Sequence, residues 1–195
     1  MKRLAIPFPL VALAVAGLTA LVLLLMGQPA ICTCGRIDLW APGASGPTTS
    51  QMLADWYSPS HVIHGFLFYG LMHLVWRRAS VEKKFVASLL LEGLWEIIEN
   101  SPWILERYRS VTIEVGYYGD SVLNSMSDLA MMSLGFLLAR KLPLWASVTF
   151  ILAAEVVAAI AIRNNLFFSS LMLIAPQDWV LEWQAGGPFP LPFAG

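Results

Sequence analysis

The strongest constraint on the fold is a series of long apolar runs that ionisable residues interrupt at three places. The interruptions are residues 60–64, 92–100 and 120–128, and each abuts or enters a strongly apolar run. A charged side chain at the centre of a bilayer costs about 2.5–3.5 kcal/mol on insertion scales, so such groups face a protein interior or a wet cavity. We therefore expect these three segments to hold functional residues.

Composition identifies the class of protein. Hydrophobic residues make up 57% of the 195 residues and charged residues only 13%, and the mean hydropathy is +0.66. Soluble domains have about 45–50% apolar and about 25% charged residues. The composition predicts a multi-pass membrane protein with the lipid bilayer as its partner, folded as a single membrane domain over residues 1–195. The net charge of −1 predicts no nucleic-acid partner.

The apolar runs predict about five transmembrane helices, because a span needs about 20 residues, with a range of about 17–25. Their expected bounds are about 5–26, 61–76, 85–99, 121–139 and 144–162. The remaining segments are then two outer loops and a tail, at residues 27–60, 100–119 and 163–195. Trp179 and Trp183 favour an interfacial helix in that tail. The expected fold is an all-α, integral-membrane helical bundle with a C-terminal interfacial helix.

Basic residues predict the orientation of this bundle. They cluster beside the apolar runs, as Lys2, Arg3, Arg77, Arg78, Lys83, Lys84, Arg140 and Lys141. The positive-inside rule places these clusters in the cytoplasm, with the N-terminus inside and the C-terminus outside. A cleaved signal peptide is the alternative for the first run, but that run exceeds the usual h-region of about 7–15 residues, which favours a retained anchor. Cys32 and Cys34 then face an oxidising compartment, although this Cys-x-Cys pair implies no disulfide framework.

Helical spacing places the interrupting residues on three helix faces. The sets are His61 and His64; Glu92, Glu96 and Glu99; and Asp120, Asn124 and Asp128. Residues three or four positions apart share one face of a helix. The predicted orientation brings all three faces to the outer half of the bundle, where a ladder of acids meets a histidine pair.

Two chemistries fit this constellation. Imidazoles and carboxylates together suit Zn²⁺ or another divalent metal as cofactor. The predicted metal ligands are His61, His64, Glu96, Glu99 and Asp120. The alternative is metal-free acid–base chemistry, in which clustered carboxyls in a low dielectric hold different protonation states. The predicted catalytic residues are His64, Glu96, Asp128, Ser60 and Asn124.

Structural roles compete with these functional ones. Asp120 reads as a helix N-cap, Glu99 reads as a solvated helix end, and the histidine pair suits capping or polar interhelical bonding. Glu92, Glu96 and Asp128 lie deeper within the apolar runs, so they are hardest to explain structurally. Glu155 lies in the middle of the fifth run without an evident partner there.

Several sequence motifs resemble a family of small bacterial multi-pass membrane proteins of unknown function. The motifs are the Cys-Thr-Cys-Gly of 32–35, the Leu-Trp of 39–40, the segments 55–65, 92–101 and 119–128, and the Trp-Gln of 183–184. The resemblance covers nearly the whole chain, and it implies a bacterial inner-membrane location but no known activity. A looser similarity of layout is to VanZ-like membrane proteins. Asp120, Asn124 and Gly135 fit that layout, whereas Glu99 stands where it has a Gln.

The best functional hypothesis is a hydrolase or transferase acting on a lipid or lipid-linked envelope substrate, with a site open to the periplasmic side. The alternatives are an ion- or proton-coupled transporter, and a non-enzymatic envelope assembly or accessory protein with a partner of its own. Transport ranks second, because below Glu92 and Asp128 only Ser88 and Ser133 offer a polar path to the cytoplasm.

Overall fold

The protein is described here by a computed structural model, which places residues 8–113 and 116–187. Every regular element in these ranges is an α-helix, so the all-α prediction is confirmed. The helices are α1 (Phe8–Leu25), α2 (Ser58–Val75), α3 (Val81–Glu99), α4 (Pro102–Val111), α5 (Val122–Lys141), α6 (Leu144–Ile162), α7 (Leu166–Ile174) and α8 (Asp178–Gln184).

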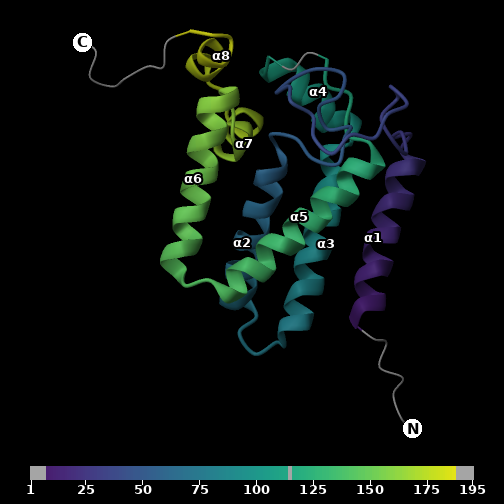
Figure 1. The fold of residues 1–195 in the computed structure, drawn as a ribbon, viewed down its shortest axis with the longest axis vertical. Helices are drawn as coiled ribbons and strands as arrows, with labels where there is room; N and C mark the ends of the chain where they lie inside the picture. The colour runs from purple at the N-terminus through teal and green to yellow at the C-terminus, as the bar shows by residue number, and fades with distance from the viewer. Residues whose placement is uncertain (1–7, 114–115, 188–195) are drawn as a thin grey trace.

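Three of these helices, α1, α5 and α6, are long and apolar enough to cross a membrane. The helices α2 and α3 have 18 and 19 residues and stand in the same bundle (Figure 1), but they carry most of the interrupting acids and histidines. Those polar residues lower the mean hydropathy of α2 and α3. Of the five expected spans, three therefore correspond to helices that are long and apolar enough to cross a membrane. Residues 5–7 of the first expected span lie outside the described residues.

The helices α2 and α3 both begin earlier than the apolar runs suggested. Pro59 stands in the first turn of α2, where its missing N–H costs no hydrogen bond. At α3 the side chain of Ser80 caps the helix by accepting a hydrogen bond from the backbone N–H of Lys83. Polar capping residues set these starts, whereas hydropathy located only the apolar part of each helix.

The tightest helix contact lies between α2 and α5, which runs obliquely across the bundle (Figure 1). Gly65 of α2 and Gly135 of α5 lie at this crossing. A Cβ atom built on Gly65 would lie 2.8 Å from the carbonyl carbon of Gly135, and one on Gly135 would lie 2.9 Å from that of Val62. Two glycines therefore allow the two backbones to touch, as small residues do in membrane helix pairs.

An apolar cluster fills the bundle on one side of the polar residues. Leu89 of α3 packs there with Leu129, Met132 and Phe136 of α5, all of them at most 4% exposed. In sequence these residues lie beyond Glu92 and Asp128, towards the start of α3 and the end of α5. This half of the bundle is therefore an ordinary packed core.

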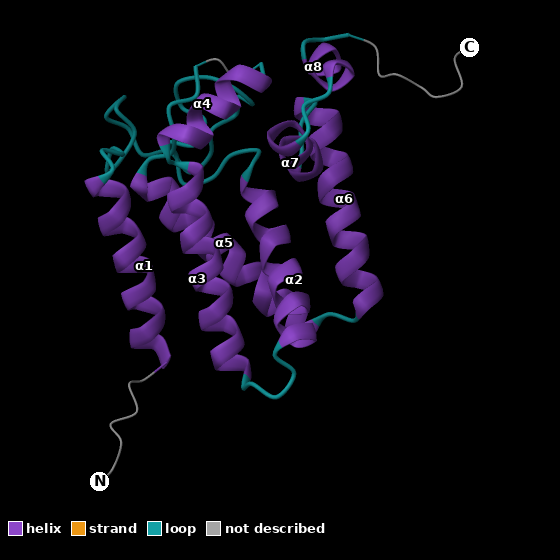
Figure 2. Cartoon of the chain, turned by 180° about the vertical axis from the view of Figure 1, so that it is seen from behind, coloured by secondary structure: helices purple, strands orange, loops and turns teal. Residues whose placement is uncertain are grey.

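Three short helices gather at the opposite end of the bundle (Figure 2), and only the last of them, in the tail, was expected. The helix α4 lies inside the expected outer loop 100–119, where Ser101 caps it and Pro102 starts it. The expected tail contains α7 as well as α8, which carries the two tryptophans predicted in an interfacial helix. Phe168 and Met172 of α7 pack with Val111 of α4 and Val180 of α8.

Glu155 of α6 explains how the apolar helix α7 is held. Its carboxylate oxygens accept hydrogen bonds from the backbone N–H groups of Leu166 (3.1 Å) and Phe167 (3.0 Å). A carboxylate at a helix N-terminus satisfies free N–H groups and complements the helix dipole. Glu155, whose partner the sequence left open, is therefore paired with the backbone at the start of α7, a helix that the sequence did not predict.

Candidate functional site

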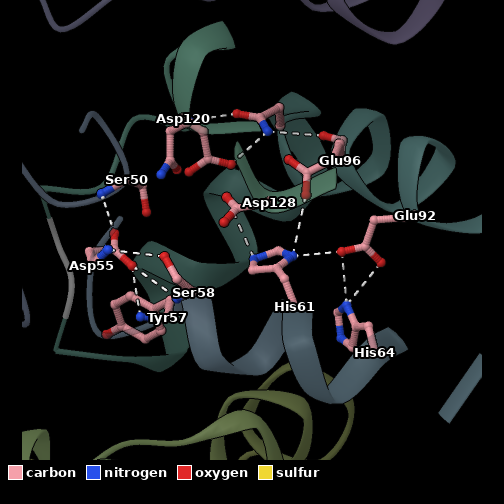
Figure 3. A network of polar contacts seen from close by, with 12 residues as sticks. Ser50, Asp55, Tyr57, Ser58, His61, His64, Glu92, Glu96, Asp120 and Asp128 are labelled. Atoms are coloured by element: carbon pink, nitrogen blue, oxygen red, sulfur yellow. Dashed lines mark hydrogen bonds and ion pairs between the residues drawn. The ribbon is translucent and has the colours of Figure 1, made fainter. Parts of the chain in front are cut away.

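The structure brings the three interrupting segments together at the end of the bundle where α2 begins and α3 ends. Figure 3 shows their side chains converging from three helices. Those at the centre are His61 and His64 of α2, Glu92 and Glu96 of α3, and Asp128 of α5. Glu92 and Glu96 are fully buried, and Asp128 is 4% exposed. The convergence predicted from helical spacing is therefore a feature of the fold.

Glu92 joins the two histidines. Nδ1 of His61 lies 2.7 Å from Oε1 of Glu92, and Nδ1 of His64 lies 3.0 Å from Oε2. Because both rings direct Nδ1 at one carboxylate, Glu92 fixes their orientation and leaves the opposite ring nitrogens for other partners. Sequence placed Glu92 in the acid ladder but not among the predicted ligands or catalytic residues. Its depth in the apolar run was the signal that marked it.

Glu96 and Asp128 flank His61 with unsatisfied oxygens. Oε1 of Glu96 lies 3.5 Å from Nδ1 of His61, and Oδ2 of Asp128 lies 3.7 Å from Nε2. Within the described ranges, neither oxygen of Glu96 nor Oδ1 of Asp128 has a hydrogen-bond partner. Leaving a buried polar group without a partner costs about 1–3 kcal/mol, and more when the group is charged. These two carboxyl groups are thus the part of the site that protein contacts leave incomplete.

Asp120 takes a different place from the one that its helix-start sequence suggested. Ser121 is the N-cap of α5, and Asp120 instead accepts hydrogen bonds from Nδ2 of Asn100 (2.8 Å) and the hydroxyl of Tyr117 (2.7 Å). Its own backbone N–H donates to Oδ1 of Asn100. Burial raises the pKa of Asp120, and burial next to Asp120 raises the pKa of the Tyr117 hydroxyl well above its ordinary value. Asp120 therefore ties the end of α3 to the start of α5.

Asp55 is a buried acid that the functional reading of the sequence missed. Its carboxylate accepts hydrogen bonds from the backbone N–H groups of Ser50, Tyr57 and Ser58, and Ser58 Oγ accepts one from the N–H of Asp55. This reciprocal pair resembles a capping box. The signal was present, because Asp-x-x-Ser directly precedes the apolar run of α2. Asp55 positions the turn that carries His61.

The loop between α1 and α2 covers the start of α5. The carbonyl oxygens of Pro29 and Ala30 accept hydrogen bonds from the backbone N–H groups of Val122 and Leu123, two groups that the helix itself cannot satisfy. In the same loop Cys32 and Cys34 form a disulfide with each other. This loop therefore belongs to the structural support of the site rather than to a free linker.

A cavity of about 80 Å³ borders the polar cluster. Its walls from the long helices include Ser60, His61, His64, Trp95, Glu99, Asn124 and Asp128. The opposite wall comes from α7, through Ser169, Ser170 and Leu173. A single water needs only about 10–15 Å³ of such space, so the cavity has room for several waters or a small polar group. Of the predicted catalytic residues, all but Glu96 line this cavity.

Comparison with known proteins supports the family resemblance. The family described as "Protein of unknown function (DUF2585)" matches residues 23–186. The chain belongs to this family. A "UPF0314 protein" of Novosphingobium aromaticivorans is 49% identical over 177 residues, covering 88% of this chain and 89% of that protein. A UPF0314 protein of Paracoccus denitrificans is 49% identical over 168 residues, covering 86% of this chain and 87% of that protein.

A third relative, a UPF0314 protein of Rhizobium meliloti, is 44% identical over 185 residues, which are 95% of this chain and 94% of that protein. No solved structure matches the chain. Membership of the DUF2585 family supplies no activity, and the looser similarity to VanZ-like proteins stays a prediction. The chemistry of the site must therefore be argued from its own geometry.

Proposed function

We propose that this member of the DUF2585 family is an inner-membrane hydrolase or transferase that acts on a lipid or lipid-linked envelope substrate. The supporting observation is that the imidazoles of His61 and His64 both contact the buried carboxylate of Glu92 while bordering one cavity. A carboxylate that orients an imidazole is the arrangement by which many enzymes prepare a general base. Two such imidazoles are more than packing or capping requires.

The proposed orientation has five crossings, with the site on the periplasmic side. The described basic clusters support it, because Arg77 and Arg78 lie between α2 and α3, Lys83 lies in the first turn of α3, and Arg140 and Lys141 end α5. These positions are at the end of the bundle opposite the site (Figure 1). The positive-inside rule assigns that end to the cytoplasm. The disulfide in the loop near the site agrees, since disulfides persist in oxidising compartments.

The residues at the cavity divide the proposed work between them. Nε2 of His64 acts as the base, because Nδ1 faces Glu92, and the hydroxyl of Ser60 or a water is the group that it activates. Asp128 is the acid on the opposite side of the cavity. Asn124 donates from Nδ2 to the carbonyl oxygen of Met52, so it holds the outer loop beside the cavity.

The form of the cavity favours an amphipathic substrate. Its polar walls suit a small head group, while the exposed side chains of Leu94 and Ile98, on the same helix as Trp95, suit an acyl or prenyl chain in the bilayer. The helix α7 adds Ser169 and Ser170 to the polar lining, although it is otherwise apolar. A lipid can thus present its head group to the histidines while its tail remains in the membrane.

Transport is the weaker candidate because the path towards the cytoplasm is filled. Ser88 donates to the carbonyl oxygen of Lys84 and Ser133 to that of Leu129, so both hydroxyls are used within their own helices. Leu89, Met132 and Phe136 pack between them, each at most 4% exposed. A proton or cation would find no polar route there.

A lipid-turnover assay tests the proposal. The purified full-length chain in nanodiscs of bacterial lipid extract is incubated, and released head groups and altered lipids are identified by mass spectrometry. His64→Ala should lower turnover by about 10²–10⁴-fold, the usual contribution of a general base. The matched control is His73→Ala near the other end of the same helix, whose Nδ1 contacts the backbone carbonyl oxygen of Tyr69. Equal turnover by His64→Ala and wild type would contradict the proposal, and so would the absence of turnover.

A further inference from the structure

The candidate site carries an excess of buried acid. Five carboxyl groups at this end of the bundle belong to residues at most 4% exposed, namely Asp55, Glu92, Glu96, Asp120 and Asp128. Glu99 lies beside them, and the two histidines supply at most two positive charges. Within residues 8–113 and 116–187, no lysine or arginine forms a salt bridge with any of these acids. Ionised carboxylates cannot remain buried together without cations or protons to neutralise them.

Two overlapping sets of side chains have donor atoms close enough to share one metal ion. Each set keeps its donor atoms within 4.8 Å of one another, the first being His61, His64 and Glu92 and the second His61, Glu96 and Glu99. The first set is already satisfied, because Glu92 makes contacts of 2.7 Å and 3.0 Å with the two imidazoles. A metal there would have to replace these contacts.

The second set is the one that protein contacts leave open. Both oxygens of the fully buried Glu96 lack a hydrogen-bond partner within the described chain. Protonation would neutralise Glu96 but would leave an equally unpaired hydroxyl, whereas a cation neutralises the charge and occupies the oxygens. Asp128 lies on the other side of the His61 ring, nearest to Nε2, so it stands outside this set.

We infer that His61, Glu96 and Glu99 bind one divalent first-row metal ion. One imidazole with carboxylates suits Zn²⁺ or Mn²⁺ better than a soft ion that prefers thiolates. Glu92 contacts Nδ1 of the same ring and so orients His61 beside Glu96. This inference deepens the proposed function, on which its catalytic meaning rests, because such a metal lowers the pKa of a bound water and makes it a nucleophile at neutral pH.

Metal content and a cobalt titration test the inference. The full-length chain is purified in detergent from cells grown with added Zn²⁺ and Mn²⁺, and metal per chain is measured by inductively coupled plasma mass spectrometry. Co²⁺ is then titrated into chelator-treated protein while its visible absorption is recorded. The variants are Glu96→Gln and Glu99→Gln, and the matched control is Glu82→Gln, an exposed acid in the first turn of the same helix.

The wild type and Glu82→Gln should hold about one ion per chain and give the same cobalt spectrum. Glu96→Gln and Glu99→Gln should bind at least about tenfold more weakly, since even residues that only support a ligand contribute about 10–100-fold to metal affinity. Elution volume and thermal unfolding of each variant show that it is folded. If one variant does not fold, the other variant and the wild-type spectrum still decide the question.

Two outcomes overturn the inference. One is a wild type with no stoichiometric metal and no cobalt spectrum, which would mean that the buried carboxyls are neutral acids. The other is equal metal binding by Glu96→Gln, Glu99→Gln and wild type, which would place the ion elsewhere. Failure of the proposed function looks different, because metal bound with no lipid turnover would leave the site standing, and turnover by metal-free protein would support the function alone.

Discussion

Nδ1 of His61 lies 2.7 Å from Oε1 of Glu92. The apolar cluster around Leu89 and Phe136 fills the bundle between this contact and the start of α3. His61 and Glu92 come from neighbouring helices and are 31 positions apart in sequence. Glu92 also contacts His64, so one buried carboxylate holds two imidazoles. The rest of the candidate site is arranged around this relationship, because it determines which ring nitrogens remain for a metal or a substrate.

Removal of Glu92 should destabilise the protein strongly. Glu92→Ala leaves two imidazoles buried without their shared partner, and loss of one member of a buried charged pair costs about 3–5 kcal/mol. Denaturant unfolding in detergent measures the loss. The control is Glu106→Ala on the exposed face of α4, which should stay within about 0.5 kcal/mol of wild type. Similar losses for the two variants would show that Glu92 does not hold the site together.

The crossing of α2 and α5 should be intolerant of a single added methyl group. Gly65→Ala or Gly135→Ala forces a Cβ atom into the backbone of the other helix and should cost about 1–3 kcal/mol or more, because the backbone cannot yield as a side chain can. Gly70→Ala on α2 is the matched control. It has nothing within 4 Å of the new atom, and alanine is favoured over glycine in a helix by about 1 kcal/mol.

Thermal unfolding of the three glycine variants in detergent separates close packing from helix propensity. The expected order of stability is Gly70→Ala at or above wild type, then wild type, then the two crossing variants. Equal behaviour of all three would refute the close approach of α2 and α5. Since α2 carries the histidines, the crossing variants should also weaken any metal binding.

Neutralising Glu155 should loosen α7 while leaving the rest of the bundle intact. Glu155→Gln keeps the size of the side chain but removes the charge from two hydrogen bonds to the start of α7. An acid at this position contributes about 0.3–1 kcal/mol, up to about 2 kcal/mol when partly buried. Hydrogen–deuterium exchange should therefore speed up at the amides of Leu166–Ile174 and remain unchanged in α3. Unchanged exchange in α7 would mean that Glu155 does not hold that helix.

Asp120 should make the protein less stable as pH rises. Burial raises the pKa of Asp120 above its ordinary value of 3.8, so the folded state keeps this proton to higher pH than the unfolded state does. The folded state then binds more protons, and unfolding free energy falls as pH increases from 3.8 through the raised pKa. Asp120→Asn has no carboxyl group at this position, so its unfolding free energy does not fall with pH for this reason. Its stability relative to wild type should therefore increase with pH across that window.

Denaturant unfolding at a series of pH values measures this difference between Asp120→Asn and wild type. The control is Asp38→Asn, because the side chain of Asp38 is 48% exposed and pairs with Arg36 at the surface. This control measures what an Asp→Asn change at an exposed position does by itself. A constant difference for Asp120→Asn would contradict a raised pKa for Asp120.

The sequence predicted the parts of the structure that follow from local chemistry. Composition and the length of the apolar runs predicted helices, and the last expected span, 144–162, coincides with α6. The i, i+3 and i, i+4 spacing of His61, His64, Glu92 and Glu96 predicted which side chains share a helix face. The capping signal of Ser101 and Pro102 was also readable in the sequence. It marks the start of α4, which lies inside a segment that was expected to be a loop.

What the sequence determined alone is a helical protein whose acids and histidines face one another at one end. Tertiary structure alone decided that Glu92 is shared by two imidazoles, that Glu96 has no hydrogen-bond partner among the described residues, and that Glu155 accepts hydrogen bonds from the first N–H groups of α7. The physical reason is that helical periodicity fixes the face on which a side chain lies. Which atoms meet across that face depends on how closely helices approach, and here two glycines at the crossing of α2 and α5 set that distance.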